Sequence, residues 1–208
     1  MTFKGFNKID FTTFKIDGLD ERMEAIQQRI QPKFKELGDE LCPFLSSIVD
    51  NEMYLHIAKH ARRSVNPPND TWMAICHNKR GYKKHPHFQI GLFDDHVFIW
   101  LAYIYELPNK QEIAQRFLDD IHSIRKNIPS QYVVSLDHMK KDAETLGTID
   151  LEKALLRFHD VKKAEFLIGR HINHTDPLLH DGEKFVSFIK QTFEDLVPLY
   201  KTSMNSDI

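Results

Sequence analysis

The stretch PHFQIGLFDDHVFIWLAYIY, residues 86–105, decides the fold that the sequence predicts. Its first half, 86–93, alternates apolar with polar or small side chains, as a β-strand with one buried face does. Its second half, 96–105, is almost continuously apolar, which is typical of a central strand covered on both faces. The pair Asp94-Asp95 between them provides a tight turn, so the stretch predicts an antiparallel hairpin.

Comparable patterns on both sides of the hairpin predict further strands and helices. Alternating or short apolar runs predict strands at 53–60, 71–78, 132–136 and 165–172, and a short edge strand or extended lead-in at 9–16. Apolar side chains three and four positions apart predict helices at 20–31, 32–48, 108–128, 150–158 and 182–200. We expect Asp20 to cap the first helix, Pro32 to open the second and Pro198 to bend or end the last.

The order of these elements indicates the fold class. Sequential strands joined by short turns predict a mostly antiparallel sheet of five to six strands. Helices before, between and after these strands then predict an α+β domain, with the helices packed on the sheet. No change of composition divides the 208 residues, so we expect a single domain over 1–208, with a frayed tail at about 203–208.

Composition places the chain among soluble globular proteins. Apolar residues make up 41% of it and charged residues 28%, which are ordinary globular values. The longest apolar run, Val97–Tyr105, is too short to cross a bilayer as a helix, and the first residues lack the apolar core of a signal peptide. Cys42 and Cys76 form neither a CxxC pair nor a disulfide framework. We therefore expect a cytoplasmic protein with two reduced thiols and no membrane partner.

Positive charge is concentrated in one window, residues 51–90. This window holds seven Lys or Arg and two acids, so its formal charge is +5, whereas the whole chain carries −2. The rest of the chain therefore carries −7. Five of the twelve histidines also lie in this window. A nearly neutral whole chain excludes bulk attraction to nucleic acid, so only this local patch is suited to attract an anion.

The strand pattern turns this window into a candidate site. Two clusters of Lys and Arg flank the strands at 53–60 and 71–78, and a simple meander brings them to one rim of the sheet. Arginine offers a planar fork, and lysine a point charge, to phosphate or carboxylate. We predict that an anionic small molecule or nucleic acid binds at His56, Lys59, His60, Arg62, Arg63, Arg80, Lys84 and His87. A solvated basic face, or ion pairs with the acidic remainder of the chain, explains the same pattern equally well.

Strand parity predicts where the histidines point. His56 and His60 share one face, opposite the apolar residues of their strand, and His87 shares a face with Gln89. A metal site needs three or four converging ligands, and no HExxH motif or carboxylate at a ligand spacing accompanies these histidines. We therefore predict hydrogen-bonding histidines on an exposed, anion-facing rim, with no metal and no other cofactor.

Common catalytic motifs are absent from the sequence. It contains no Walker A loop, no GxGxxG and no GxSxG, and neither cysteine has an obvious activating partner. Asp137-His138, which follows the strand at 132–136, fits an acid–base pair at a strand end. The simpler interpretation, a capping aspartate beside an exposed histidine, is favoured.

Four segments give the chain a family resemblance. They are KHARRSVNPPNDTW (59–72), NKRGYKKHPHFQIGLF (78–93), LDHMK (136–140) and VKKAEFLIGR (161–170). Together they resemble the YktB-like family, small cytoplasmic proteins of low-GC Gram-positive bacteria with a domain of unknown function, over essentially the whole chain. The resemblance implies a single α+β domain, grouped loosely with the catalytic fold of biotin ligases and class II synthetases. The resemblance assigns no catalytic residue to this chain, and a fold alone does not give a function.

Three functions stay open on this sequence. The first is a binding module for the anionic ligand. The second is an enzyme that uses a histidine of the same face as general acid or base, in a concave pocket that holds His56, His60 or His87 beside Arg62 or Arg80. The third is a structural or regulatory protein that binds another protein or a second copy of itself. The sequence does not predict an oligomeric state.

Overall fold

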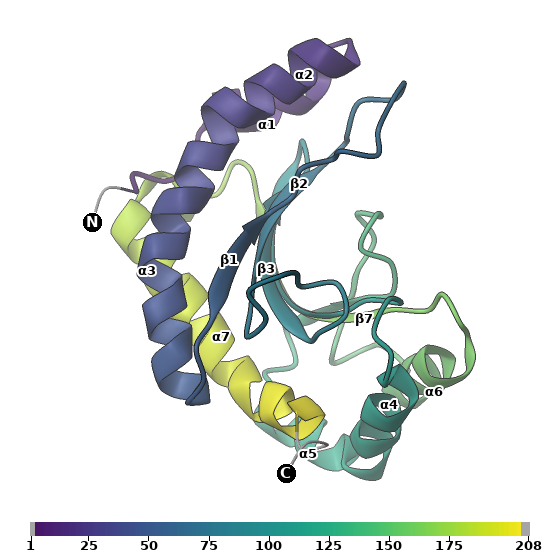
Figure 1. Ribbon diagram of the computed structural model, residues 1–208. Helices are drawn as coiled ribbons and strands as arrows, with labels where there is room; N and C mark the ends of the chain where they lie inside the picture. The colour runs from purple at the N-terminus through teal and green to yellow at the C-terminus, as the bar shows by residue number, and fades with distance from the viewer. Residues whose placement is uncertain (1–2, 205–208) are drawn as a thin grey trace.

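A curved antiparallel sheet forms the centre of the protein, as Figure 1 shows for the computed structural model, which describes residues 3–204. Among these residues its strands are β1 (Tyr54–Ile57), β2 (Thr71–Cys76), β3 (His87–Leu92), β4 (His96–Tyr103), β5 (Val133–Ser135), β6 (Glu144–Thr145) and β7 (Phe166–Asn173). They lie in the order β1-β2-β3-β4-β7-β5-β6, and every neighbouring pair is antiparallel. The α+β prediction is confirmed, although the sheet has seven strands rather than five to six.

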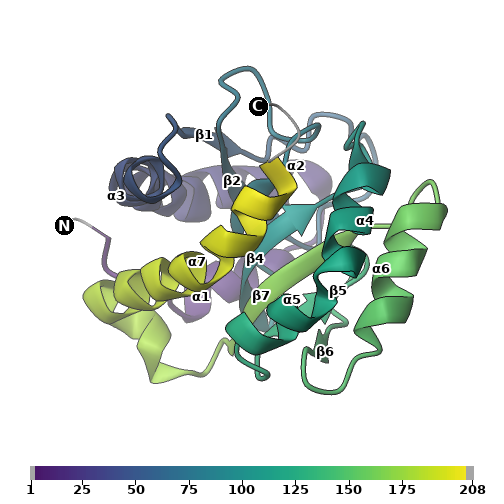
Figure 2. The same cartoon turned by 90° about the horizontal axis from the view of Figure 1, so that it is seen from below.

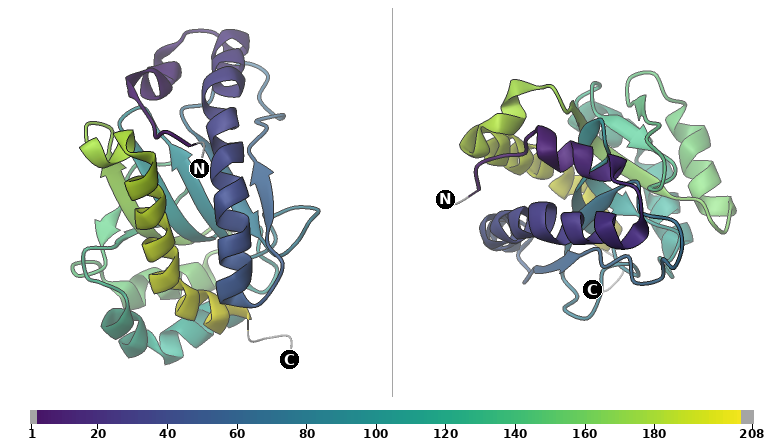
Figure 3. Two further views of the ribbon diagram at one scale, coloured as in Figure 1. Left: turned by 90° about the vertical axis from the view of Figure 1, so that its left-hand side faces the viewer. Right: turned by 90° about the horizontal axis from the view of Figure 1, so that it is seen from above.

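Helices cover one face of this sheet. They are α1 (Lys8–Thr12), α2 (Leu19–Ala25), α3 (Gln31–Val49), α4 (Lys110–Asp119), α5 (Ile121–Asn127), α6 (Leu151–Asp160) and α7 (Gly182–Met204), with 3₁₀ turns at Thr13–Lys15 and Pro177–His180. The two long helices, α3 and α7, lie across the sheet in Figure 3, and Figure 2 shows α4 and α6 beyond α7. Their apolar stripes share one core with the strands. Within the described residues, no helix is long and apolar enough to span a bilayer.

The predicted hairpin forms and lies inside the sheet. β3 and β4 pair so that Ile90 is opposite Ile99 and Gln89 is opposite Trp100. Every residue of both strands is buried. Because side chains alternate along a strand, Ile90 and Ile99 point into the helix-covered core, whereas Trp100 belongs to a separate small cluster that contains no helix residue. We call the side of the sheet that carries Gln89 and Trp100 its second face.

Residues 9–15 of the segment 9–16 are helical, so the predicted edge strand is wrong. The Asn7 side chain accepts a hydrogen bond from a backbone amide of α1, and the Asp10 carboxylate accepts one from the backbone N of Asn7. This reciprocal capping box satisfies donors at the helix start. Phe11 and Phe14, three positions apart, are both buried by the turn. The same residues also fit strand alternation, which is why the pattern alone is misleading.

The long helical region after Gly18 is continuous where two separate helices are predicted. A π-helical turn at Ile26–Ile30 joins α2 to α3. Gly18, with a φ of 86°, precedes α2, so Asp20 lies in the first turn rather than at the cap. Pro32 lies in the first turn of α3, directly after the π-helical turn, and because the helical region is continuous its missing N–H removes a hydrogen bond to the preceding turn.

Two further helix boundaries and one short strand differ from the predictions. The helix at 108–128 breaks at Asp120, whose φ of −121° separates α4 from α5. α7 runs past Pro198 and includes the buried Ser203, which is therefore not frayed, while 205–208 lie outside the described residues. β6 has two exposed residues, too few to give a periodic pattern.

Gly169, in β7, allows a close approach to β4 and gives a test of this packing. A Cβ there would lie 1.9 Å from the carbonyl oxygen of Ile99. We expect Gly169→Ala to lower the free energy of unfolding by about 1–3 kcal/mol, because the two strands must move apart. Gly81→Ala is the matched control, since a Cβ at Gly81 meets nothing within 4 Å. Urea unfolding measures both variants, and equal midpoints would contradict the tight contact.

Candidate functional site

Loops fold back over the second face of the sheet and line a hollow of about 1180 Å³. One wall consists of β1 and the loop that follows it, residues 58–63. The opposing wall consists of the loop between β2 and β3, residues 78–85. Residues 104–106, after β4, continue the lining, and Trp72 and Gln89 contribute from the sheet.

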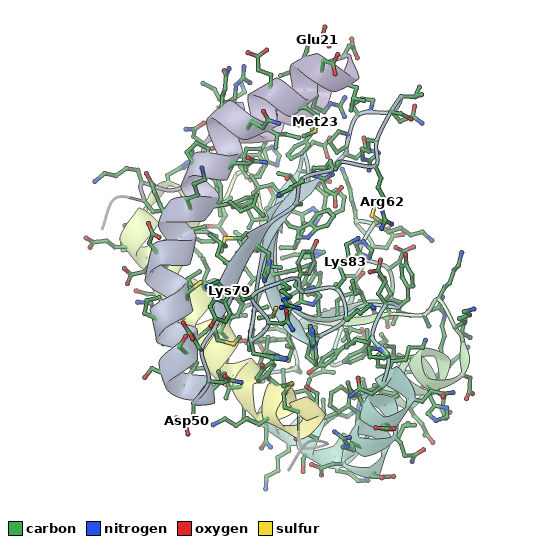
Figure 4. All side chains as sticks on the ribbon, in the orientation of Figure 1. Glu21, Met23, Asp50, Arg62, Lys79 and Lys83 are labelled. Carbon is green, nitrogen blue, oxygen red and sulfur yellow. The ribbon has the colours of Figure 1, made fainter. Side chains whose placement is uncertain are left out.

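Seven of the eight predicted site residues line this hollow, namely His56, Lys59, His60, Arg62, Arg63, Arg80 and Lys84. The two basic loops therefore converge, as expected for the meander that β1 to β4 form. Lys79 and Lys83 belong to the same lining, in which Glu106 is the only acid among the described residues. Figure 4 shows Arg62 and Lys83, which come from different loops, on the side of the sheet away from α3.

The basic side chains around the hollow mostly lack an acidic partner. Lys83 pairs with Glu106, with an N–O distance of 3.5 Å. No ion pair within the described chain involves Lys59, Arg62, Arg80 or Lys84, all of which are exposed. The alternative of internal ion pairing therefore does not apply to these four charges.

His60 reaches the hollow although it lies outside a strand. β1 ends at Ile57, so the predicted strand to His60 is three residues too long, and His60 itself has a φ of 49°. Its Nε2 lies 3.2 Å from Oγ1 of Thr71, and its ring packs edge-on against Trp72. Burial, with a smaller effect from Arg63, lowers the pKa of His60 to about 4, so the ring is neutral at pH 7.

The prediction that His87 lies on an exposed rim is wrong, because its side chain is completely buried. Its Nδ1 donates to the backbone oxygen of His85 at 2.8 Å, and its Nε2 accepts from the Gln89 amide at 3.1 Å. The ring of Tyr82 packs against it with centroids 4.9 Å apart. Burial lowers the pKa of His87 to about 3. The loop 77–86 folds over the strand here and covers the face that parity marks as exposed.

A hydrogen bond from Trp72 Nε1 to the Tyr82 hydroxyl, 3.0 Å long, holds this loop against the sheet. His56 packs against the same tyrosine ring, and its Nε2 donates to the backbone oxygen of Asn78. Cys76 also donates to Asn78, and burial raises the pKa of its thiol. These contacts therefore hold the loop between β2 and β3 against the sheet. Because the pKa of its thiol is raised, Cys76 is not an activated nucleophile.

Sequence reasoning misses the pair formed by His138 and Glu165. Oε2 of Glu165, which precedes β7, accepts hydrogen bonds from Nδ1 of His138 at 2.7 Å and from its backbone N at 2.8 Å. Glu165 is 3% exposed, and His138 lines the hollow. Asp137 does cap the turn by accepting from the backbone N of Met139, but His138 is not the exposed histidine of the favoured interpretation. A lone acid at the start of an apolar strand is the only sequence signal for Glu165.

The surroundings of His138 favour its charged form. Burial opposes the imidazolium, but the hydrogen bond to Glu165 and the charges of Glu165, Asp70 and Asp137 outweigh it, so the pKa of His138 lies above its ordinary value. Its other ring nitrogen, Nε2, has no hydrogen-bond partner among the residues that the structure describes. This nitrogen is therefore available to a bound molecule.

Asp70, which immediately precedes β2, is buried beside the hollow and has an unpartnered oxygen. Its side chain is 1% exposed, and its Oδ2 has no hydrogen-bond partner within the described chain. Burial raises the pKa of Asp70 to about 6, against the opposing effects of His138 and Arg63. Ionised Asp70 therefore destabilises the folded protein at neutral pH.

Asp137, His138 and Glu165 also have the donor types of a metal site, with ligand atoms within 4.8 Å of one another. Nδ1 of His138 and Oε2 of Glu165 are already hydrogen-bonded to each other. Oε2 is also bonded to the backbone N of His138. The geometry favours acid–base chemistry here, and the absence of a metal stays a prediction.

Comparison with known proteins identifies relatives along almost the whole chain. Residues 6–200 match the family model described as Domain of unknown function (DUF1054). The chain is 63% identical over 203 residues to a UPF0637 protein of Oceanobacillus iheyensis, which covers 97% of this chain and 98% of the relative. It is 57% identical over 206 residues to a UPF0637 protein of Shouchella clausii, covering 99% and 98%. The predicted likeness to a family of Gram-positive bacterial proteins with a domain of unknown function is confirmed.

The buried Asp70 predicts how stability depends on pH. Because its pKa is raised in the folded state, the folded protein binds this proton more tightly than the unfolded chain and loses stability as the pH rises from about 4 to about 6. Asp70→Asn removes this loss. We expect the variant to gain about 1–3 kcal/mol relative to the wild type between pH 4 and pH 7, as measured by urea unfolding.

The control for this measurement is Asp142→Asn, which changes an exposed acid between β5 and β6. It should leave the pH dependence of the wild type unchanged. If Asp70→Asn and the wild type lose equal stability over this range, Asp70 is not the titrating group.

Proposed function

We propose that this chain, which belongs to the family of the domain of unknown function DUF1054, is a cytoplasmic protein that binds a small phosphorylated molecule in the hollow on the second face of its sheet. The observation that carries the proposal is the lining, which contains seven Lys or Arg and one acid. Of the seven, only Lys83 has an ion-pair partner in the described residues, so the charge of the other six is available to a ligand.

The charge arrangement supports an anion with several acceptor oxygens. A concave site lined by one sign of charge concentrates the electrostatic field and raises the local concentration of an oppositely charged ligand. Arg62 and Arg80 come from different loops of the lining, and each offers a planar fork of donors to the oxygens of an anionic ligand. Lys84 adds a point charge from the same rim.

The shape of the hollow favours a small molecule over nucleic acid. Its volume of about 1180 Å³ is close to the range of ligand pockets, about 300–1,000 Å³. Trp72 and Tyr82 are hydrogen-bonded to each other and partly buried, so they do not form the exposed stacking platform that single-stranded nucleic acid uses. Ala61 and Met139, which are exposed and line the hollow, offer apolar surface to the rest of a ligand.

Cysteine usage supports the cytoplasmic part of the proposal. Cys42 and Cys76 are both free. Burial raises the pKa of Cys42 to about 11, which protects the thiol from reaction. Unpaired thiols are typical of a reducing compartment, where phosphorylated metabolites are abundant.

Calorimetric titration with inorganic phosphate tests the proposal. We expect wild-type protein to bind phosphate with an affinity that falls as the salt concentration rises. The double variant R80A/K84A should bind about 100-fold more weakly or worse, because each lost charge-assisted contact contributes about 1.5–3 kcal/mol and 1.4 kcal/mol is tenfold.

The matched control is K126A/K153A, which removes two exposed lysines of α5 and α6 that do not line the hollow. It should bind phosphate like the wild type. Fluorescence anisotropy with a short single-stranded RNA separates the nucleic-acid alternative, which requires tighter binding of RNA than of phosphate and a steep salt dependence. Binding of neither probe at low salt would refute the proposal and leave a solvated basic face.

A further inference from the structure

His138 and Glu165 form a pair that ligand binding alone does not require. Oε2 of Glu165 accepts hydrogen bonds from both Nδ1 and the backbone N of His138. The side chain of His138 lines the hollow, and its Nε2 has no hydrogen-bond partner in the described part of the chain. We propose that the hollow is an active site in which His138 transfers a proton during the hydrolysis of a phosphoester, with Glu165 as its positioning residue. This inference rests on the proposed binding function, which holds the phosphoryl group beside His138.

Glu165 fixes the orientation and the tautomer of the imidazole. One carboxylate oxygen holds both the ring and the backbone of His138, while Oε1 accepts a longer hydrogen bond, 3.4 Å, from the backbone N of Tyr105. Trp72 packs edge-on against the ring, with centroids 5.9 Å apart. Because an ionised carboxylate only accepts, Nδ1 carries the proton, and Nε2 of the neutral ring keeps its lone pair for the hollow.

The charged groups around His138 support proton transfer. They come from several elements: Glu165 precedes β7, Asp70 precedes β2, Asp137 adjoins His138, and His87 lies in β3. Burial opposes the imidazolium, but the three acids raise the pKa of His138 above its ordinary value. Burial keeps His87 neutral, so it adds no opposing charge at pH 7. A histidine held in one orientation by a carboxylate, with its second ring nitrogen free of partners in the described chain, suits general acid–base catalysis.

Water is the nucleophile in the proposed reaction. No Ser, Thr or Cys is among the described residues that line the hollow. Burial raises the pKa of the Tyr82 hydroxyl to about 12, and this hydroxyl already accepts a hydrogen bond from Trp72. Tyr82 is therefore not ionised at neutral pH, and the proposed reaction uses water as its nucleophile.

The proposed reaction consumes one water and balances without a further reactant. The oxygen of the water attacks phosphorus, and Nε2 of His138 takes a proton from that water. The bond between phosphorus and the alcohol oxygen breaks, and Nε2 returns the proton to the leaving oxygen. The products are the alcohol and phosphate, and the imidazole is again neutral. Arg62, Arg80 and Lys84 stabilise the charge on the phosphoryl oxygens.

Hydrolysis of p-nitrophenyl phosphate and bis(p-nitrophenyl) phosphate by the full chain tests the inference. We expect the wild type to release p-nitrophenol, and H138Q to lower kcat by about 10²–10⁴-fold, the usual contribution of general acid–base catalysis. Its Kd for inorganic phosphate should change little. H122Q, which alters an exposed histidine of α5 outside the hollow, is the matched control and should keep the wild-type kcat.

Glu165→Gln separates positioning from a merely structural role. The glutamine amide can donate to Nδ1, which reverses the tautomer and removes the lone pair from Nε2. We expect a lower kcat and an acid limb of the kcat/KM profile that moves to lower pH, because the loss of the carboxylate lowers the pKa of His138. A structural role alone would change the melting temperature without moving this limb.

Two results would overturn the catalytic assignment and leave the binding function standing. One is wild-type protein that binds phosphate but hydrolyses neither ester, and the other is hydrolysis that H138Q leaves unchanged. If H138Q does not fold, ¹⁵N-histidine spectra of the wild type decide: added phosphate must move the Nε2 resonance of His138, and an unmoved resonance refutes the contact. Failure of the wild type to bind phosphate refutes the proposed function itself.

Discussion

The central strands β3 and β4 must be covered on both faces, because every one of their side chains is buried. Helices cover one face, and loops cover part of the other. Trp72 bonds to Tyr82 in the loop between β2 and β3, and Lys141, after β5, pairs with Asp94 and Asp95 at the hairpin turn. Because these loops are held by a few contacts rather than by continuous apolar stripes, they leave a hollow between them. The candidate site is a consequence of how the second face is covered.

The loops that cover the second face also determine which histidines are charged, because burial shifts their pKa values. Burial lowers the pKa of His60 to about 4 and the pKa values of His87 and His171 to about 3, so these three rings are neutral at physiological pH. His138 is partly buried, but the carboxylate of Glu165 raises its pKa instead. The positive charge around the hollow that does not change near neutral pH therefore comes from Lys and Arg, whereas the charge of His138 depends on its protonation. The residues that attract an anion are thus different from the residue that transfers a proton.

Local sequence patterns predict the elements that local physics controls. The hairpin at 86–105 follows from alternation and a two-residue turn, and Asp150 caps α6 as its position before an apolar stripe indicates. The patterns fail at 9–16, where alternation and a three-residue spacing coexist and the capping box decides for a helix. They also fail at β6, which is too short to show a period.

By itself the sequence determined which segments carry the charges of the site, because turn residues and strand ends fix where the two basic loops begin and end. Only the tertiary structure decided that the loop over β3 buries His87 and that His138 meets Glu165, 27 positions along the chain. Strand parity tells which face a side chain leaves from, but it does not tell what folds over that face. Contacts between distant segments depend on the packing of the whole sheet, and no local periodicity records them.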